Sequence, residues 1–206
     1  KRTIQFRHRA IGNFNINLYL DVTQERAYAR ELKRLAETDP LTGVMNRRRF
    51  FEEAEQHYGN RSSVVAVLML DIDNFKRIND LHGHGTGDLV LKEFTRRCRA
   101  VIRKDDLLAR LGGEEFIILL KAADAHKAID VGERIRDYIR ALPFAFDGVE
   151  LNVTVSIGAA LRRSGEVSVE STISRADRVL YAAKHAGRDR VILDAVCEVE
   201  SELTVE

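Results

Sequence analysis

Apolar and polar residues alternate with period two along the first 22 residues of the chain. The alternating apolar residues form two runs on either side of Gly12-Asn13: Ile4 and Phe6, then Phe14, Ile16, Leu18, Leu20 and Val22. This pattern predicts two strands joined by a turn. Because two strands alone are marginally stable in water, we expect residues 1–22 to pair with a sheet from a preceding domain or another chain.

A helical period replaces the alternation at residue 23. Tyr28, Leu32 and Leu35 lie on one stripe, at positions i, i+4 and i+7, and Pro40 indicates that the helix ends before it. Residues 23–38 therefore form a second segment. Its single stripe is shorter than the roughly three to four heptads that define a coiled coil, so pairing with a second copy and packing on its own domain both remain open.

From residue 39 to residue 193, helical and strand patterns succeed one another. Val64 to Leu70 is an unbroken apolar run, which is typical of a strand buried on both faces. Gly112-Gly113 between two apolar runs predicts a β-hairpin. Further segments are predicted as strands at 107–111, 116–120, 150–157 and 190–193, and as helices after Asn46 and at 87–102, 124–141 and 168–186. This order predicts an α/β (α+β) domain.

Two predicted helices have a defined buried face. The expected inward residues are Phe50, Ala54 and Tyr58 in the first, and Val90, Leu91, Phe94, Cys98 and Val101 in the helix at 87–102. By contrast, residues 194–206 carry five acidic and no basic side chains, and we expect them to form a frayed tail.

Composition excludes several classes of protein. The 206 residues include 33 Lys and Arg against 32 Asp and Glu, a net charge of +1, which disfavours a nucleic-acid-binding module. The longest apolar run has seven residues, whereas a membrane helix needs about 20. Cys98 and Cys197 lie far apart and indicate neither a disulfide framework nor a zinc site. We expect a cytoplasmic domain with no membrane span in this segment, although a parent protein could be anchored in a membrane.

Acidic side chains lie at two places in the predicted sheet: the end of the buried strand and the turn of the hairpin. Asp71 and Asp73 end the buried strand, where paired carboxylates suit a hard cation such as Mg²⁺; the alternative is a solvated turn in which Asp73 caps a helix. Glu114 and Glu115 follow the glycine pair, whose backbone allows a ligand to approach closely. An ordinary polar hairpin turn is the alternative there.

Other polar residues suggest a nucleotide. The glycine-rich stretch 83–88 matches neither a P-loop nor a G-x-G-x-x-G motif. Asn79 and Asp88 together offer the amide and carboxylate that can bind guanine, although Asp88 could instead cap a helix. Lys184 and Arg188, spaced i, i+4, can hold a triphosphate or simply complement a helix dipole.

Taken together, these residues resemble the GGDEF domain of diguanylate cyclases over about residues 39–193. Five ordered blocks at the family's spacing carry the resemblance: residues 39–48, residues 71–80, Gly83-His84 with Gly87-Asp88, Gly112-Gly113-Glu114-Glu115-Phe116, and residues 183–188. Two positions depart from the usual pattern. Val44 replaces Leu, and Glu114 replaces Asp at the third signature position, which the family accepts.

The resemblance implies condensation of two GTP into cyclic di-GMP with release of two pyrophosphates. The implied fold is that of nucleotide-cyclase palms, with a five-stranded, antiparallel-rich sheet flanked by helices. By similarity, Asp71, Glu114 and the Ile72 carbonyl hold two Mg²⁺ or Mn²⁺ ions per active site, and Glu115 helps to deprotonate the 3′-hydroxyl or holds the second ion. The implied ligand contacts are Asn79 and Asp88 with guanine, and Phe75, Lys76, Lys184 and Arg188 with the phosphates.

The resemblance also implies a homodimer, because each subunit binds one GTP and the product contains two. Residues 23–38 would then be a signalling coiled-coil helix, and residues 1–22 the last hairpin of a PAS-like sensor domain. Arg103 and Asp106 match the family's RxxD product-inhibition site, and Arg134 matches a secondary contact from a neighbouring domain. The alternatives are a catalytically silent GGDEF domain that acts as a receptor for GTP or cyclic di-GMP, and a cyclase that also uses ATP. The second is disfavoured, because Asp88 would meet the acceptor N1 of adenine.

Overall fold

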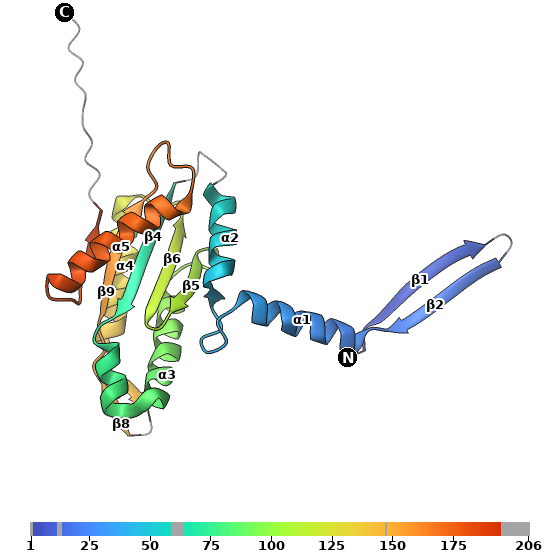
Figure 1. Ribbon diagram of the computed structural model, residues 1–206, viewed down its shortest axis with the longest axis horizontal. Coiled ribbons are helices and arrows are strands. Elements are labelled where there is room, and N and C mark those ends of the chain that lie inside the picture. The colour runs from blue at the N-terminus through green and yellow to red at the C-terminus, as the bar shows by residue number, and fades with distance from the viewer. Residues whose placement is uncertain (1, 12–13, 59–63, 147, 195–206) are drawn as a thin grey trace, which may run out of the picture. The chain divides into compact units, whose positions relative to one another are not determined.

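The computed structural model describes residues 2–11, 14–58, 64–146 and 148–194, and the chain divides into two units, Lys1–Thr38 and Asp39–Glu206 (Figure 1). In the first unit, β1 (Ile4–Ile11) pairs antiparallel with β2 (Phe14–Asp21), and α1 (Thr23–Glu37) follows. The predicted hairpin and helix are confirmed. The predicted turn of the hairpin, Gly12-Asn13, lies outside the described residues.

A mixed sheet forms the centre of the second unit, in the order β10-β9-β4-β6-β5-β3. Its middle strand β4 (Val65–Ile72) pairs antiparallel with both β6 (Glu115–Lys121) and β9 (Val155–Leu161). β5 (Leu107–Gly112) completes the hairpin with β6. Two short strands add parallel edges: β10 (Val191–Leu193) beside β9, and β3 (Met45–Asn46) beside β5.

Helices cover both faces of this sheet, as expected for strands that are apolar on both sides. Helices α3 (Phe75–Val101) and α4 (Ala125–Ala141) contribute buried residues to one core, and α2 (Arg47–Tyr58) and α5 (Val169–His185) to the other (Figure 1). The predicted inward residues Phe50, Ala54 and Tyr58 are buried, and Val101 is half-buried. The α/β architecture with an antiparallel-rich sheet is therefore confirmed.

Two details of the predicted sheet are wrong. The sheet has six strands in the described part of the chain, because β3 is two residues long and too short to show a period. The expected strand at 150–157 is two strands: β8 (Val149–Leu151), which pairs with β7 (Phe144–Phe146) in a separate sheet, and β9. Apolar alternation continues across the junction between them, so it concealed the change of sheet.

The predicted frayed tail is wrong at its first residue. Asp194 is 4% exposed, and its carboxylate accepts hydrogen bonds from Arg163, Arg175 and Arg178 at 2.7–2.8 Å. Asp194 therefore belongs to the folded unit, whereas residues 195–206 lie outside the described residues. Three partners from distant segments explain why local composition did not reveal this role.

No helix in the described part of the chain combines the length and apolar character that crossing a bilayer requires.

Candidate active site

The acidic end of β4 arises from the strand's own periodicity. Val65, Val67 and Met69 point to the core under α2 and α5, and the alternate residues point to the core under α3 and α4. Asp71 continues the first of these faces at the end of the strand, where it is 5% exposed. A rigid, fully buried strand thus presents the carboxylate at the edge of the core.

The β5–β6 hairpin brings two further carboxylates to Asp71. Gly112 and Gly113 have φ values of 156° and 51°, and the second of these lies in the left-handed region that favours glycine. Glu115 lies directly opposite Asp71 in the antiparallel pairing, and the Ile72 amide is 3.4 Å from the Glu114 carbonyl oxygen to which it donates. The pairing of strands remote in sequence therefore assembles the predicted acidic group.

Lys184 supplies a cation to this group from the last turn of α5. Its Nζ lies 2.7 Å from Asp71 Oδ2. Burial raises the pKa of Asp71 to about 6; Lys184 opposes this shift, and the charges of Glu114 and Glu115 reinforce it. The site thus holds more negative charge than one ammonium group neutralises.

These oxygen donors fit a hard divalent cation. In the described residues, no three His, Cys, Asp or Glu side chains converge into a preformed metal cluster. The Lys184 ammonium instead occupies the place of positive charge beside Asp71. Asp71, the half-buried Glu114 and the Ile72 carbonyl are the groups that could hold an ion once it displaces this lysine.

The two predicted guanine ligands lie on α3, on either side of its bend. α3 is non-helical at Gly83 (φ 81°, ψ 161°), which joins the predicted helix at 87–102 to an earlier helical segment. A Cβ atom on Gly87 would lie 1.9 Å from Asn79 Oδ1 and 3.2 Å from the Phe75 ring, so glycine permits this close approach. The exposed Asp88 is the next residue. Asn79 Oδ1 is buried beside Gly87 without a hydrogen-bond partner among the described residues.

The predicted phosphate ligands are less closely gathered. Phe75 is 6% exposed and packs in the core, whereas Lys76 and Arg188 are exposed. Arg188 lies in the turn after α5 with φ 62°, and its amide donates to the Ala183 carbonyl at 3.0 Å. Of the predicted phosphate cations, Lys184 is the one that contacts the acidic group.

The predicted inhibitory residues line a separate cavity of about 230 Å³ between the end of α3 and α4. Arg103 and Asp106 border it, and the Asp106 carboxylate accepts from the amides of Arg103 and Lys121 at 3.0 and 3.1 Å. Arg134 lines the same cavity, with its guanidinium 3.3 Å from the Val101 carbonyl. Arg103 and Arg134 thus line one cavity within the chain. The contact from a neighbouring domain that the resemblance implies for Arg134 stays a prediction.

Sequence reasoning missed the role of Asp73. This residue was open to interpretation as a helix cap, but the N-cap of α3 is Asn74 in a left-handed conformation, with no side-chain cap bond. Asp73 is 5% exposed and instead accepts hydrogen bonds from Thr154 and Ser156. Those donors lie 81 and 83 residues away. The available signal was the spacing Asp-x-Asp at the end of a buried strand, which by strand alternation would direct both carboxylates to one side.

Comparison with known proteins identifies the family. The family model described as "Diguanylate cyclase, GGDEF domain" matches residues 36–190. The chain is 38% identical over 169 residues to Diguanylate cyclase A of Treponema denticola, an alignment that covers 79% of this chain and 46% of that protein. The chain thus spans less than half the length of this relative.

Solved structures agree in fold. The coiled coil and GGDEF domain of DgcB from Caulobacter crescentus, in complex with c-di-GMP, is 32% identical with a TM-score of 0.78, covering 84% of this chain and 93% of that chain. The active GGEEF domain of a diguanylate cyclase from Vibrio cholerae is 31% identical with a TM-score of 0.67, covering 73% and 97%. With a family model that matches well over half of its residues, this chain belongs to the GGDEF-domain family of diguanylate cyclases.

Proposed function

We propose that this domain condenses two GTP molecules into cyclic di-GMP and releases two pyrophosphates. The observation that carries the proposal is the group formed by Asp71, Glu114, Glu115 and Lys184, in which a buried carboxylate with a raised pKa faces two more acids and one displaceable cation. Perturbed carboxylates at a strand end are typical of sites that bind a divalent metal and a phosphate ester.

The residues divide the work between binding and charge neutralisation. Divalent ions held by Asp71, Glu114 and the Ile72 carbonyl would activate the attacking 3′-hydroxyl and stabilise charge on the α-phosphate and the leaving pyrophosphate. Lys184, Lys76 and Arg188 neutralise the triphosphate, with Phe75 anchoring the start of α3 beside it. Glu115, which is exposed and opposite Asp71, is placed to accept the hydroxyl proton or to add a ligand for the second ion.

Asn79 and Asp88 account for the choice of base. The unpartnered Asn79 Oδ1 and the exposed Asp88 carboxylate are two acceptors, and guanine offers them N1–H and N2–H donors. Adenine offers an acceptor at N1, which would leave the Asp88 charge unpaired. The Vibrio cholerae structure, described as an active GGEEF domain, supports Glu at the third signature position as compatible with activity.

The direct test is to incubate the chain with GTP and Mg²⁺ and to separate products by mass-resolved chromatography. We expect cyclic di-GMP from the unchanged chain and from Glu150→Ala, an exposed glutamate outside the site, but none from Glu114→Ala. ATP in place of GTP should give no cyclic dinucleotide. GTP binding without turnover, even at high protein concentration or with a fused dimerising zipper, would favour the silent-receptor alternative.

A homodimer is part of the proposal, because one site holds one GTP and the bond joins two. Tyr28, Leu32 and Leu35 on α1 are 53–70% exposed, which leaves an apolar stripe available for a second copy. The DgcB structure includes a coiled coil. Leu32→Glu should shift the chain toward monomer in sedimentation experiments and lower turnover, whereas Gln24→Glu on the same helix should not. Turnover restored by a fused zipper would separate loss of pairing from misfolding.

We assign residues 1–22 to the last hairpin of a PAS-like sensor domain.

Product inhibition at the cavity of Arg103, Asp106 and Arg134 is the second regulatory proposal. The cavity combines two exposed arginines with a carboxylate already oriented by backbone amides. Such a set can bind guanine and phosphate together. Arg103→Ala should leave the initial rate unchanged and abolish inhibition by added cyclic di-GMP, with Arg99→Ala as the matched surface control. Full sensitivity in Arg103→Ala would refute this assignment.

A further inference from the structure

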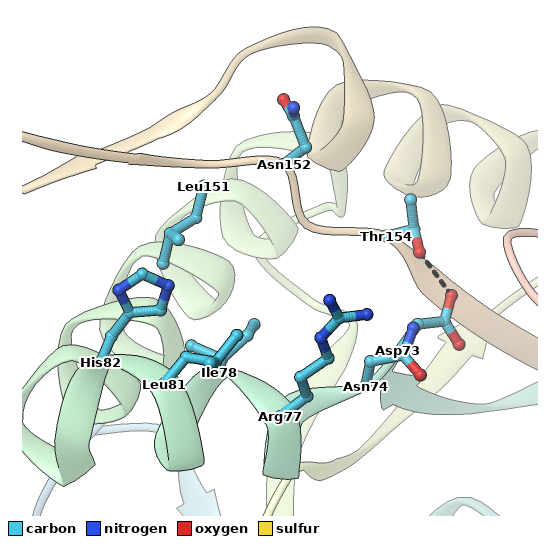
Figure 2. A pocket seen from close by; sticks show the side chains of 9 residues that line it. All are labelled: Asp73, Asn74, Arg77, Ile78, Leu81, His82, Leu151, Asn152 and Thr154. Carbon is cyan, nitrogen blue, oxygen red and sulfur yellow. Dashed lines mark hydrogen bonds between the residues drawn. The ribbon is translucent and has the colours of Figure 1, made fainter.

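The buried carboxylate of Asp73 links the end of β4 to two other segments of the chain, one at Thr154 and Ser156 and one at Asp189. Its Oδ2 accepts from Thr154 Oγ1 at 2.7 Å and from the Asp189 backbone amide at 3.1 Å, and its Oδ1 accepts from Ser156 Oγ at 2.7 Å. Figure 2 shows the bond to Thr154 at the side of a cavity of about 220 Å³. Since a carboxylate has about four acceptor positions, most of its capacity is already used.

The turn that Asp73 holds is conformationally costly. Gly187, Arg188 and Asp189 have consecutive φ values of 109°, 62° and 42°. A residue other than glycine in the left-handed region costs roughly 1 kcal/mol or more, so two such residues in succession need external contacts to persist. Besides Asp73, Arg136 Nη1 donates to the Asp189 carbonyl at 3.2 Å from the α4 side.

This turn carries part of the proposed phosphate site. Arg188 is its central residue, and Lys184, one helical turn earlier, reaches Asp71 at 2.7 Å. Asp73 is two residues after Asp71, in the turn that directly follows the end of β4. The carboxylate therefore ties the backbone that bears Arg188 to the strand end that bears Asp71.

We propose that Asp73 is a positioning residue whose carboxylate fixes the turn 187–189, so that Arg188 is held toward the triphosphate bound beside Asp71. The inference rests on the proposed function, because the triphosphate is that of GTP. It assigns the two aspartates of Asp71-Ile72-Asp73 different roles: the first faces the ligand, and the second is occupied by protein donors.

The test compares Asp73→Ala with Asp73→Asn. The Asn amide oxygen can still accept from Thr154 and Asp189, and its NH₂ can donate to the Ser156 hydroxyl, so the tie survives without the charge. We expect Asp73→Ala to weaken binding of a fluorescent GTP analogue with Mg²⁺ about tenfold, the scale of one charge-assisted hydrogen bond, and Asp73→Asn to stay within about twofold. Asn152→Ala, which lines the same cavity in Figure 2, is the matched control and should bind normally.

A double-mutant cycle establishes whether Asp73 acts through Arg188. In an Arg188→Ala background, Asp73→Ala should cause little further loss of GTP affinity, because the positioned side chain is already gone. Additive losses would overturn the proposal. Should Asp73→Ala fail to fold, Asp73→Ser replaces it, since its short hydroxyl cannot span both β9 and the turn.

Two further measurements separate this inference from rival explanations. Hydrogen exchange at the Asp189 amide should speed up in Asp73→Ala and stay protected in Asp73→Asn, whether or not the chain makes product. Mn²⁺ binding without nucleotide should be the same in Asp73→Asn and the unchanged chain; loss of Mn²⁺ in Asp73→Asn would make Asp73 a metal ligand and overturn the inference. If the unchanged chain neither binds GTP nor makes product, the proposed function fails, while unchanged Asp189 exchange in Asp73→Ala refutes the tie itself.

Discussion

Asp71 and Asp194 are equally hidden from solvent, at 5% and 4% exposure, yet their surroundings push their protonation in opposite directions. Asp71 has one ammonium partner and two acidic neighbours, and burial raises its pKa to about 6. Burial also raises the pKa of Asp194, but hydrogen bonds from Arg175 and Arg178 outweigh it and hold the pKa below its ordinary value.

The difference shows how a binding site and a structural site are built from the same residue. Around Asp194, arginines on α5 and on the preceding loop satisfy both carboxylate oxygens, and Arg175 extends the network to Glu166. Around Asp71, the chain leaves negative charge in excess. Such an excess costs folding stability and is neutralised when a cationic ligand binds.

The largest expected effect is on activity at Asp71. Asp71→Asn keeps the shape of the side chain but removes its charge, and we expect product formation to fall by about 10²–10³-fold, as for removal of a key electrostatic group. The same variant should not be destabilised. Formation of cyclic di-GMP at near-normal rates by Asp71→Asn would contradict its proposed role.

Asp194→Ala should have the largest effect on stability. Removing one partner of a buried charge cluster leaves the arginines uncompensated, and we expect a loss of about 2–4 kcal/mol, reduced by the exposure of Arg178. Urea unfolding measures the loss. Turnover per folded molecule should be preserved, since Asp194 does not contact the acidic group. A loss of turnover in the folded variant would contradict a purely structural role for Asp194.

The pH dependence of stability sharpens the contrast. Because the folded-state pKa of Asp71 is raised, the native chain holds this proton more tightly than the unfolded chain, and its stability falls as pH rises from about 4 to about 6. The Asn side chain of Asp71→Asn does not ionise, so this variant lacks the fall in stability. In EDTA, we therefore expect Asp71→Asn to match the unchanged chain near pH 4 and to be more stable by about 1–2 kcal/mol above pH 6, after allowance for solvent screening.

The control for that measurement is Asp105→Asn, which removes a carboxylate at an exposed position outside the acidic group. Its stability relative to the unchanged chain should not vary over the same pH interval. An Asp71→Asn advantage that was constant with pH would mean that packing, rather than ionisation, causes it.

The smallest expected effect is on stability, at Tyr58. This residue lies at the edge of the network that Arg175 forms with Asp194 and Glu166. Its hydroxyl donates to Thr172 Oγ1 at 2.7 Å, and Thr172 donates in turn to Glu166 at 2.7 Å. Tyr58→Phe should cost about 1 kcal/mol, the net value of one buried hydrogen bond, without changing activity. Tyr28→Phe, at a position 70% exposed on α1, should leave thermal unfolding unchanged.

Much of the fold was predictable because its signals are local. The unbroken apolar run became the middle strand β4, the glycine pair became a hairpin turn, and the apolar stripes became α2 and the second part of α3. The errors occurred where contact with another helix or strand determines the local structure. β9 extends through Gly158, where a Cβ atom would lie 2.1 Å from the Ala176 carbonyl of α5, and small residues there do not look like a strand until that helix is in place.

The site divides in the same way. Which residue types are present, and the order of the motif blocks from residue 39 to residue 188, are properties of the sequence, and they were enough to indicate a GGDEF domain and its acidic residues. Three features of the site are decided only by the tertiary structure: the distance between Asp71 and Lys184, the pKa of Asp71, and the hydrogen bond from the Asp189 amide to Asp73. These depend on burial and on partners more than 100 residues away, because hydrogen bonds and desolvation act over a few ångströms of space, and only the packed sheet and helices bring those groups within that range.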